Sequence, residues 1–319
     1  MECVAYRQGK RVGDIAIGEI GETLKQEGTF VWLGLCESDD ALSDKIQAVF
    51  GLHELAVEDA RSAHQRPKLE SYGDTLFLAM KTAHWSGDTA RFGETHVFVG
   101  ARFLISIRYG PALESGNVRE HCESIPRRLA QRPGFVLYAI MDHVVDNYMP
   151  VVSGLQQGLE SLEADIFKRQ DYRMALEELY ALEQELVLLK SAIEPLPDIC
   201  SELMHFHDPI IPKDMRFYYR DIYDHARRIN QTIGTLREML ATATQVHLTA
   251  VTVGQNEVVK RLAGWGAILN IPILVFSLYG MNFKHMPELE LRYGYPAVLG
   301  GVFASCLLLY VRLKRLGWL

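Results

Sequence analysis

Cysteines are few in this sequence, and their spacing excludes two kinds of site. The five cysteines among the 319 residues are scattered and form no C-x-x-C pair, so they indicate neither a disulfide framework nor a zinc-binding motif. Free thiols of this kind are typical of the reducing cytosol, where we expect most of the chain to lie. Residues 1–10 contain no apolar core, and we therefore expect no cleaved signal peptide.

The sequence also lacks an excess of positive charge and a catalytic metal motif. Its formal net charge is -7, whereas binding to nucleic acid requires a basic face that neutralises phosphates. No H-E-x-x-H segment or comparable set of ligands occurs. We therefore expect no nucleic-acid partner, no organic cofactor and no enzymatic activity.

The first third of the chain has the pattern of a mixed α and β domain. Apolar, β-rich runs predict strands, and turn residues such as Ser86-Gly87-Asp88 separate them from other segments. The stretch Asp40–Arg61 predicts a helix between the first two runs. The β pattern ends near Gly134. The predicted strands are Phe30–Leu35, Thr75–Met80, His96–Val99 and Phe103–Ile107.

From Val136 to about Asn256 the pattern is helical, with two coiled-coil-like seams of apolar residues. The first seam is typical of the core of a helical bundle. The second differs because no proline occurs between Lys213 and Ile271. A helix of roughly 60 residues would be ~90 Å long, which suits a stalk better than a globular domain. The first seam contains Leu179, Leu182, Leu186, Leu189, Ile193 and Leu196, and the second contains Ile222, Ala226, Ile229, Ile233, Leu236 and Leu240.

Two runs near the C-terminus have the composition and length of transmembrane helices. Leu262–Tyr279 and Tyr293–Val311 contain no charged residue, and each is close to the ~20 residues that cross the hydrocarbon core. Lys260 and Arg261 precede the first run, and basic residues at 312–315 follow the second. By the positive-inside rule, the N-terminus and the C-terminus both face the cytoplasm. We therefore expect a multi-pass protein of the inner (plasma) membrane, in contact with the lipid bilayer.

The first of these runs has features of a pore helix. Two membrane spans cannot enclose an aqueous path alone, so conduction requires several copies around an axis. Asn256, Ala263 and Asn270 are seven residues apart and fall on one stripe, among small residues that let helices approach closely. An amide inside an apolar run is costly against lipid, which indicates that Asn270 faces the axis or a neighbouring helix.

The segment Tyr279-Gly280-Met281-Asn282-Phe283 closes this run and matches the Tyr-Gly-Met-Asn-Phe signature of the CorA magnesium transporter family. Met286–Leu289 and Tyr293–Pro296 match the outer loop of the same family, in order and at the expected distance. The chain therefore resembles a magnesium and cobalt transporter of the CorA type.

The resemblance covers most of the chain. Segments 52–59 and 66–70 look like the N-terminal block of the family, 142–148 like its middle helix, 220–225 like the start of its stalk helix, and 256–260 like the entry to its first span. It implies an α+β cytoplasmic domain, a long helical stalk and two C-terminal transmembrane helices, assembled as a funnel-shaped homopentamer. The implied activity is the influx of Mg²⁺, and also of Co²⁺ and Ni²⁺, gated by intracellular Mg²⁺.

We expect the chain to divide along the same lines. Residues 1–133 form the N-terminal cytoplasmic domain, and residues 134–256 form the helical bundle and the stalk. The pore helix covers 257–280, the outer loop 281–292, the second transmembrane helix 293–312 and a basic cytoplasmic tail 313–319.

The resemblance also assigns roles in permeation. Gly280, Met281 and Asn282 form the selectivity filter, where a ring of Asn282 amides can accept hydrogen bonds from the waters of hydrated Mg²⁺ without removing them. Glu288 and Glu290 either concentrate cations at the mouth or are solvated loop charges. The residues expected to line the path are Asn256, Val259, Leu262, Ala263, Asn270 and Tyr279.

A second site is implied on the cytoplasmic side. Glu58, Asp59, Asp142 and Asp221 align with the acids that bind regulatory Mg²⁺ between protomers of the family, with Asp59 facing Asp221 across the interface. Mg²⁺ would then be both cargo and regulatory ligand. Unliganded carboxylates repel, and a dication between them holds neighbouring protomers together.

The chain departs from the family at three positions. Ile273 stands where the family has a polar residue, and Gln245 stands at an acidic position of the stalk. Asn270 stands where the family often has a methionine that narrows the pore. The hydrophobic gate is then expected elsewhere, and Leu262 and Val259 are the better candidates.

Three alternatives stay open. A zinc transporter of the same superfamily would share the filter residues. A coiled-coil membrane sensor without a pore would share the stalk and the spans. A membrane-anchored metalloenzyme would use His53, Glu58 and Asp59, and the segment 205–208 (His-Phe-His-Asp) offers further metal ligands, although a solvated loop fits that segment better.

Overall fold

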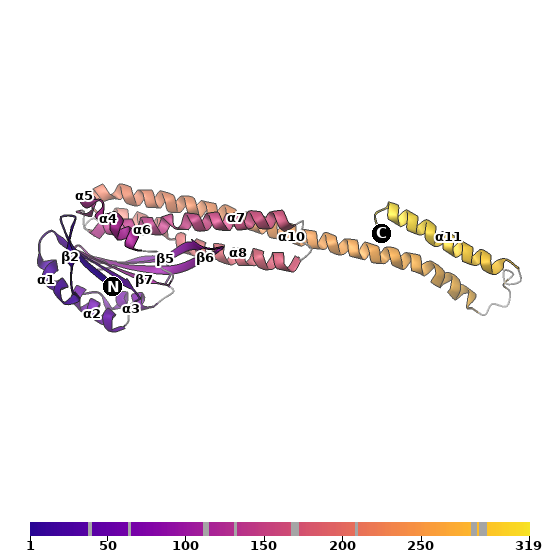
Figure 1. The fold of residues 1–319 in the computed structure, drawn as a ribbon, viewed down its shortest axis with the longest axis horizontal. Helices are drawn as coiled ribbons and strands as arrows, with labels where there is room; N and C mark the ends of the chain where they lie inside the picture. The colour runs from indigo at the N-terminus through magenta and orange to yellow at the C-terminus, as the bar shows by residue number, and fades with distance from the viewer. Residues whose placement is uncertain are drawn as a thin grey trace. The chain divides into compact units, whose positions relative to one another are not determined.

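The computed structural model describes residues 1–37, 40–62, 65–110, 115–130, 133–166, 172–207, 210–281, 286 and 292–319. The chain divides into two compact units, Met1–Thr242 and Ala243–Leu319. The first unit contains a β-sheet and a set of helices, and the second contains two helical segments (Figure 1).

Within the described residues, seven strands form one mixed sheet in the order β2-β1-β3-β7-β6-β5-β4. The central strands β3 (Thr29–Cys36) and β7 (Phe103–Tyr109) are parallel, with Val31 opposite Phe103, and the other neighbours are antiparallel. The remaining strands are β1 (Glu2–Arg7), β2 (Lys10–Asp14), β4 (Lys68–Tyr72), β5 (Thr75–Ser86) and β6 (Thr89–Val99).

Side chains along β3 alternate between the two faces of the sheet, and both faces are covered by other elements. Val31, Leu33 and Leu35 pack in one buried cluster with residues of α1 (Ile20–Lys25), α2 (Asp40–Phe50) and α3 (Glu54–Arg61). Trp32 points to the other face, where it lines a small cavity with residues of α4 (Ser115–Glu123) and α6 (Pro133–Asp146). Helices therefore cover the sheet on both sides.

The helix α7 (Tyr148–Ile166) packs closely on β5 on the second face, beside α8 (Tyr172–Ile193). A Cβ atom at Gly154 of α7 would lie only 2.4 Å from the ring of Trp85 on β5. The glycine thus permits the close approach of helix and sheet. The buried Tyr148 hydroxyl donates a hydrogen bond to the Lys81 carbonyl and fixes the start of the same helix. The short helices α5 (Pro126–Leu129) and α9 (Leu196–Phe206) also belong to this unit.

The long helix α10 (Arg216–Tyr279) has 64 residues and follows the short 3-10 helix η2 (Lys213–Met215). It confirms the predicted uninterrupted helix. The second apolar seam is buried along it from Ile222 to Leu240, and the Tyr219 hydroxyl donates to the Gly134 carbonyl at 2.7 Å. The seam therefore stabilises α10 against the rest of the first unit through apolar burial.

Several sequence predictions need correction. The strands predicted at 30–35, 75–80, 96–99 and 103–107 are confirmed, but β1, β2 and β4 were not predicted. The helix predicted at 40–61 is two helices, because Gly51 adopts a φ of 65° after α2 and His53 caps α3 by accepting the Leu55 amide. The first seam is likewise divided, since α8 ends at Ile193 and its last member begins α9.

Candidate functional site

Two helical segments in the second unit are long and apolar enough to cross a membrane. Among the described residues, these are the C-terminal part of α10 and the helix α11 (Gly294–Arg315). The rings of Trp265 and Tyr310 lie 6.3 Å apart between them. Most of their large apolar side chains are exposed, including Leu262 at 71% and Phe303 at 70%. Surfaces of this kind are unfavourable in water and suit lipid or further copies of the chain.

A proline interrupts the hydrogen bonds of α10 inside the apolar segment. Pro272 has no amide proton, so the Ile268 carbonyl four residues earlier loses its helical partner. The Cys306 thiol of α11 lies 3.7 Å from that carbonyl oxygen and donates to it. A neighbouring helix thus satisfies a group that would otherwise be costly in a bilayer.

The polar stripe of α10 lies on a face that α11 leaves uncovered. Gly264 and Ile268 are buried, with Gly264 against Leu313 and Leu319 and Ile268 beside Cys306. At about 100° per residue, these two positions lie roughly 100–140° around the helix from Ala263. The predicted path residues on the free side are all exposed: Asn256, Val259, Leu262, Ala263 and Asn270. These predicted path residues therefore lie away from the contact with α11, in a segment where most side chains are exposed.

The end of α10 coincides with the start of the predicted filter. The helix ends at Tyr279, which is half-buried, and the Gly280 amide still donates to the Phe276 carbonyl at 2.9 Å. Gly280 does not have a positive φ, so it is not the left-handed glycine that commonly caps a helix. Met281 is exposed beyond it. Asn282, Glu288 and Glu290 lie outside the described residues.

Two of the four predicted regulatory acids lie close enough to interact in the first unit. Burial raises the pKa of the Asp142 carboxyl above its ordinary value, and the negative charges of Asp146 and Asp221 act in the same direction. A hydrogen bond from the Tyr138 hydroxyl opposes the shift. The carboxylates of Asp142 on α6 and Asp221 on α10 therefore repel each other, and the nearby His225 opposes the resulting pKa shift.

The other two acids lie elsewhere, on α3. Glu58 is exposed, and Asp59 accepts a hydrogen bond from Lys68 on β4, with its Oδ2 2.7 Å from Nζ. Lys68 also reaches Glu70 at 3.1 Å. Burial alone would lower the pKa of Lys68, but the hydrogen bonds to Asp59 and Glu70 outweigh burial, and the pKa is raised. This pairing was not predicted, and no spacing in the sequence indicates it.

Other candidate metal ligands are occupied in local contacts. His53 caps α3 through Nδ1 and stacks on Tyr72 at 4.8 Å, while His205 Nδ1 lies 2.7 Å from the Ser201 carbonyl oxygen. Within the part of the chain that the structure describes, no group of three or more His, Cys, Asp or Glu residues could hold a metal ion. A complete set of ligands is therefore not gathered by these residues of a single chain.

Comparison of the sequence with known proteins identifies its family and its relatives. Residues 27–315 match the profile of the family described as CorA-like Mg²⁺ transporter protein. The cobalt/magnesium transport protein CorA of Thermotoga maritima is 29% identical over 287 residues, which cover 87% of this chain and 80% of the relative.

Two solved full-length structures share the fold. The CorA magnesium transporter of Methanocaldococcus jannaschii gives a TM-score of 0.83 at 20% identity and covers 100% of this chain and 99% of its own. The full-length CmaX protein gives a TM-score of 0.77 at 18% identity, with 98% and 97% covered. By the match of its sequence from residue 27 to residue 315, the chain belongs to the CorA-like Mg²⁺ transporter family.

Proposed function

We propose that this chain carries Mg²⁺, and also Co²⁺ and Ni²⁺, into the cell as a homopentameric channel of the inner (plasma) membrane. Both termini face the cytoplasm, the protein is not an enzyme, and Mg²⁺ is its cargo. The name of the Thermotoga maritima relative, a cobalt/magnesium transport protein, supports Mg²⁺ and Co²⁺. Basic residues precede the first apolar segment and follow the second, which supports the orientation with both termini in the cytoplasm.

The observation that carries the proposal is the uncovered polar stripe on α10. Asn256 and Asn270 are exposed amides about 40° apart around a helix that packs on α11 through Gly264 and Ile268. Amides facing lipid would be costly, whereas amides facing a shared axis are solvated. Copies arranged around that axis would supply a path with polar rings at both ends of an apolar stretch.

The side chains along the stripe suit a hydrated dication. Val259 and Leu262, which are 61% and 71% exposed, offer an apolar ring near the cytoplasmic end that can close by expelling water. Beyond Tyr279, the filter segment Gly280-Met281-Asn282 supplies neutral oxygens. Neutral oxygens hold the waters of Mg²⁺ without removing them and release the ion readily.

The acids of the first unit supply feedback. We propose that Asp142 and Asp221 of one protomer, with Glu58 and Asp59 of a neighbour, hold a regulatory dication when internal Mg²⁺ is high. The donor set fits, because carboxylate oxygens are the ligands that Mg²⁺ prefers and because Asp142 and Asp221 repel each other when both are charged. A dication bound there neutralises these acids, and its loss lets the protomers separate.

Flux into proteoliposomes tests the function. Purified full-length protein is reconstituted, a Mg²⁺-sensitive dye is enclosed, and uptake is compared with that of protein-free liposomes. We expect uptake of Mg²⁺ and Co²⁺. Entry of Zn²⁺ without Mg²⁺ would instead establish the zinc transporter, and entry of neither ion into liposomes with correctly inserted protein would favour the sensor without a pore.

A further inference from the structure

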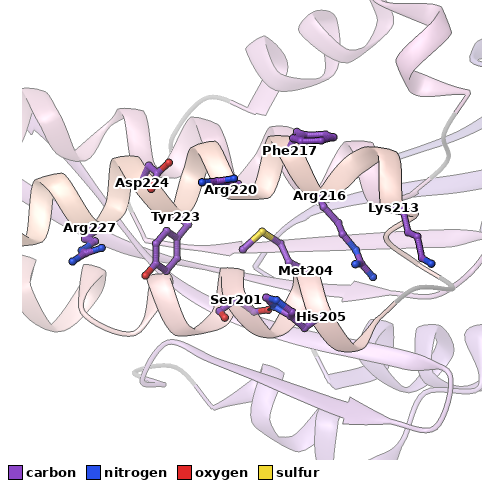
Figure 2. Close-up of a pocket in the computed structure, with 10 residues that line it drawn as sticks. All are labelled: Ser201, Met204, His205, Lys213, Arg216, Phe217, Arg220, Tyr223, Asp224 and Arg227. Carbon is purple, nitrogen blue, oxygen red and sulfur yellow. Dashed lines mark hydrogen bonds between the residues drawn. The ribbon is translucent and has the colours of Figure 1, made fainter.

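An open groove of about 710 Å³ lies between α9 and the first turns of α10, and its lining includes none of the predicted path residues or regulatory acids. Figure 2 shows Arg216, Tyr223 and Arg227 extending from α10 toward the α9 side, where Ser201 and His205 lie. Its size is within the range of about 300–1,000 Å³ that is typical of small-molecule sites.

Positive charge dominates the lining of this groove. Among the described residues, four cationic side chains line it, and Asp224 is the one carboxylate. The cations come from η2 and α10: Lys213, Arg216, Arg220 and Arg227. Lys213, Arg220 and Arg227 make no ion pair with any carboxylate of the described residues. In a chain with a net charge of -7, this concentration of cations is a local exception.

Some of these cations repel each other along α10. Residues 216, 220, 223 and 227 are spaced by three and four, so they share one face of the helix. Arg216 and Arg220 are like charges four apart, which destabilise a helix, and Asp224, four residues after Arg220, offsets part of this repulsion. The positive end of the helix dipole also lies at the N-terminus, and the first turn of α10 contains no acidic residue. A bound anion would remove both penalties.

The cationic face is distinct from the other two faces of α10. Tyr219, Ile222 and Ala226 are buried in the apolar seam, and Asp221 lies on a third face with His225, whose Nε2 is 3.9 Å from Oδ1 of Asp221. The groove therefore requires its own explanation, which is independent of the proposed transport function.

We propose that this groove binds a polyphosphate anion of nucleotide size, either a nucleoside triphosphate or an inorganic polyphosphate. The planar guanidinium groups of Arg220 and Arg227 suit bidentate hydrogen bonds to phosphate oxygens, and Lys213 adds a compact charge. The half-buried ring of Tyr223 lies between the arginines and offers a face on which a base can stack.

Binding to the purified full-length protein in detergent tests this inference. ATP and tripolyphosphate are titrated calorimetrically in EDTA, so that chelation of metal contributes no heat. The variant Arg220→Gln/Arg227→Gln removes two groove cations, and Arg228→Gln/Arg237→Gln removes two exposed cations of the same helix outside the groove. We expect the first variant to lose at least about tenfold in affinity, because charge-assisted hydrogen bonds to phosphate are lost. The control variant should bind as the wild type does.

The two probes separate the two sources of phosphate. Tighter binding of ATP than of tripolyphosphate, lost in Tyr223→Leu, would identify a nucleotide, and equal affinity would identify a polyphosphate chain. Both results support the groove as the site. The proposal would be overturned if neither ATP nor tripolyphosphate binds at millimolar concentration. It would also be overturned if the groove variant and the control variant lose affinity equally.

Discussion

The ammonium of Lys68 lies 2.7 Å from the carboxylate of Asp59, a proposed ligand of regulatory Mg²⁺. Both side chains are mostly buried, at 27% and 26% exposed, and Lys68 also holds Glu70. The protein therefore contains an internal counterion at a carboxylate that a dication is proposed to approach. We therefore expect Lys68 and the proposed dication to compete for the same negative charge, and this competition to set the Mg²⁺ concentration at which the site fills.

Replacing Lys68 by glutamine should lower the Mg²⁺ concentration needed for regulation. A partly exposed ion pair of this kind contributes about 0.5–1 kcal/mol, so we expect the midpoint to fall roughly two- to fivefold. The midpoint is measured from protection of the full-length protein against a protease as Mg²⁺ rises, since a ligand of the closed state stabilises that state.

Arg61 offers a matched control for this variant. Arg61 lies on α3, the helix that contains Asp59, but it pairs with Asp44. Arg61→Gln should leave the Mg²⁺ midpoint unchanged. A midpoint in Lys68→Gln that stays at the wild-type value, or that rises, would show that Lys68 does not compete with the metal.

Asp142→Asn should stabilise the metal-free protein at neutral pH. The pKa of Asp142 is raised in the fold mainly by burial. An acid whose pKa is higher in the folded protein than in the unfolded chain stabilises the folded state at pH values below its pKa in the unfolded chain. This stabilisation is lost as the pH rises through its pKa in the folded protein. At pH 7 the charged form is a cost, and each kcal/mol that the variant recovers should raise the Tm by about 2–4 °C.

Two further measurements check the cause of that change. The difference in Tm between Asp142→Asn and the wild type should shrink as the pH falls toward the ordinary range of a carboxyl group. Millimolar Mg²⁺ should raise the Tm of the wild type more than that of the variant. If Mg²⁺ stabilises both proteins equally, Asp142 is not a ligand.

Asp59→Ala combined with Asp221→Ala should weaken feedback by internal Mg²⁺. Both changes remove carboxylates that the inhibitory ion is proposed to bridge, and loss of metal ligands should raise the inhibitory concentration by at least about tenfold. Proteoliposome flux at low and at millimolar internal Mg²⁺ measures the effect. Asp74→Ala/Asp88→Ala, which alters two exposed turn residues, is the control. If the Asp59→Ala/Asp221→Ala variant closes over the same range of Mg²⁺ concentration as the wild type, these residues are not the sensor.

The elements that could be predicted from sequence are those with a long or regular apolar pattern. The continuous helix α10 follows from the absence of proline before Pro272 and from its buried seam, and strand β7 follows from its apolar run. Strand β1 was missed because its short buried run, residues 3–6, includes Ala5, a residue type that is depleted in strands. The break at Gly51 is set by one residue with positive φ, which a periodic pattern does not register.

Some residues of the candidate site could likewise be located from sequence, and others depend on tertiary packing. The stripe of Asn256 and Asn270 follows from spacing along one helix, so sequence alone could locate it. The interaction of Asp142 with Asp221 depends on the packing of α6 on α10 and was reached only through resemblance to a family. The contact of Lys68 with Asp59 depends on how β4 lies beside α3, and no local pattern specifies such a distance.

Asn256→Leu should reduce permeation at least about tenfold, because an apolar ring replaces a polar one at the cytoplasmic end of the stripe and favours expulsion of water. Uptake is compared at equal amounts of reconstituted protein. Asn256→Gln keeps the amide and should retain most of the flux. An unchanged rate in the leucine variant would mean that Asn256 faces away from the axis.

Mg²⁺ flux through Asn282→Ala tests the central claim most directly. The substitution removes the filter amide that is proposed to hold the hydrated ion. The mutant is purified, its oligomeric mass is matched to that of the wild type, and dye-detected uptake into proteoliposomes is compared. The account predicts that assembly is preserved and that Mg²⁺ uptake falls to the level of protein-free liposomes, whereas wild-type flux in a correctly assembled mutant would contradict it.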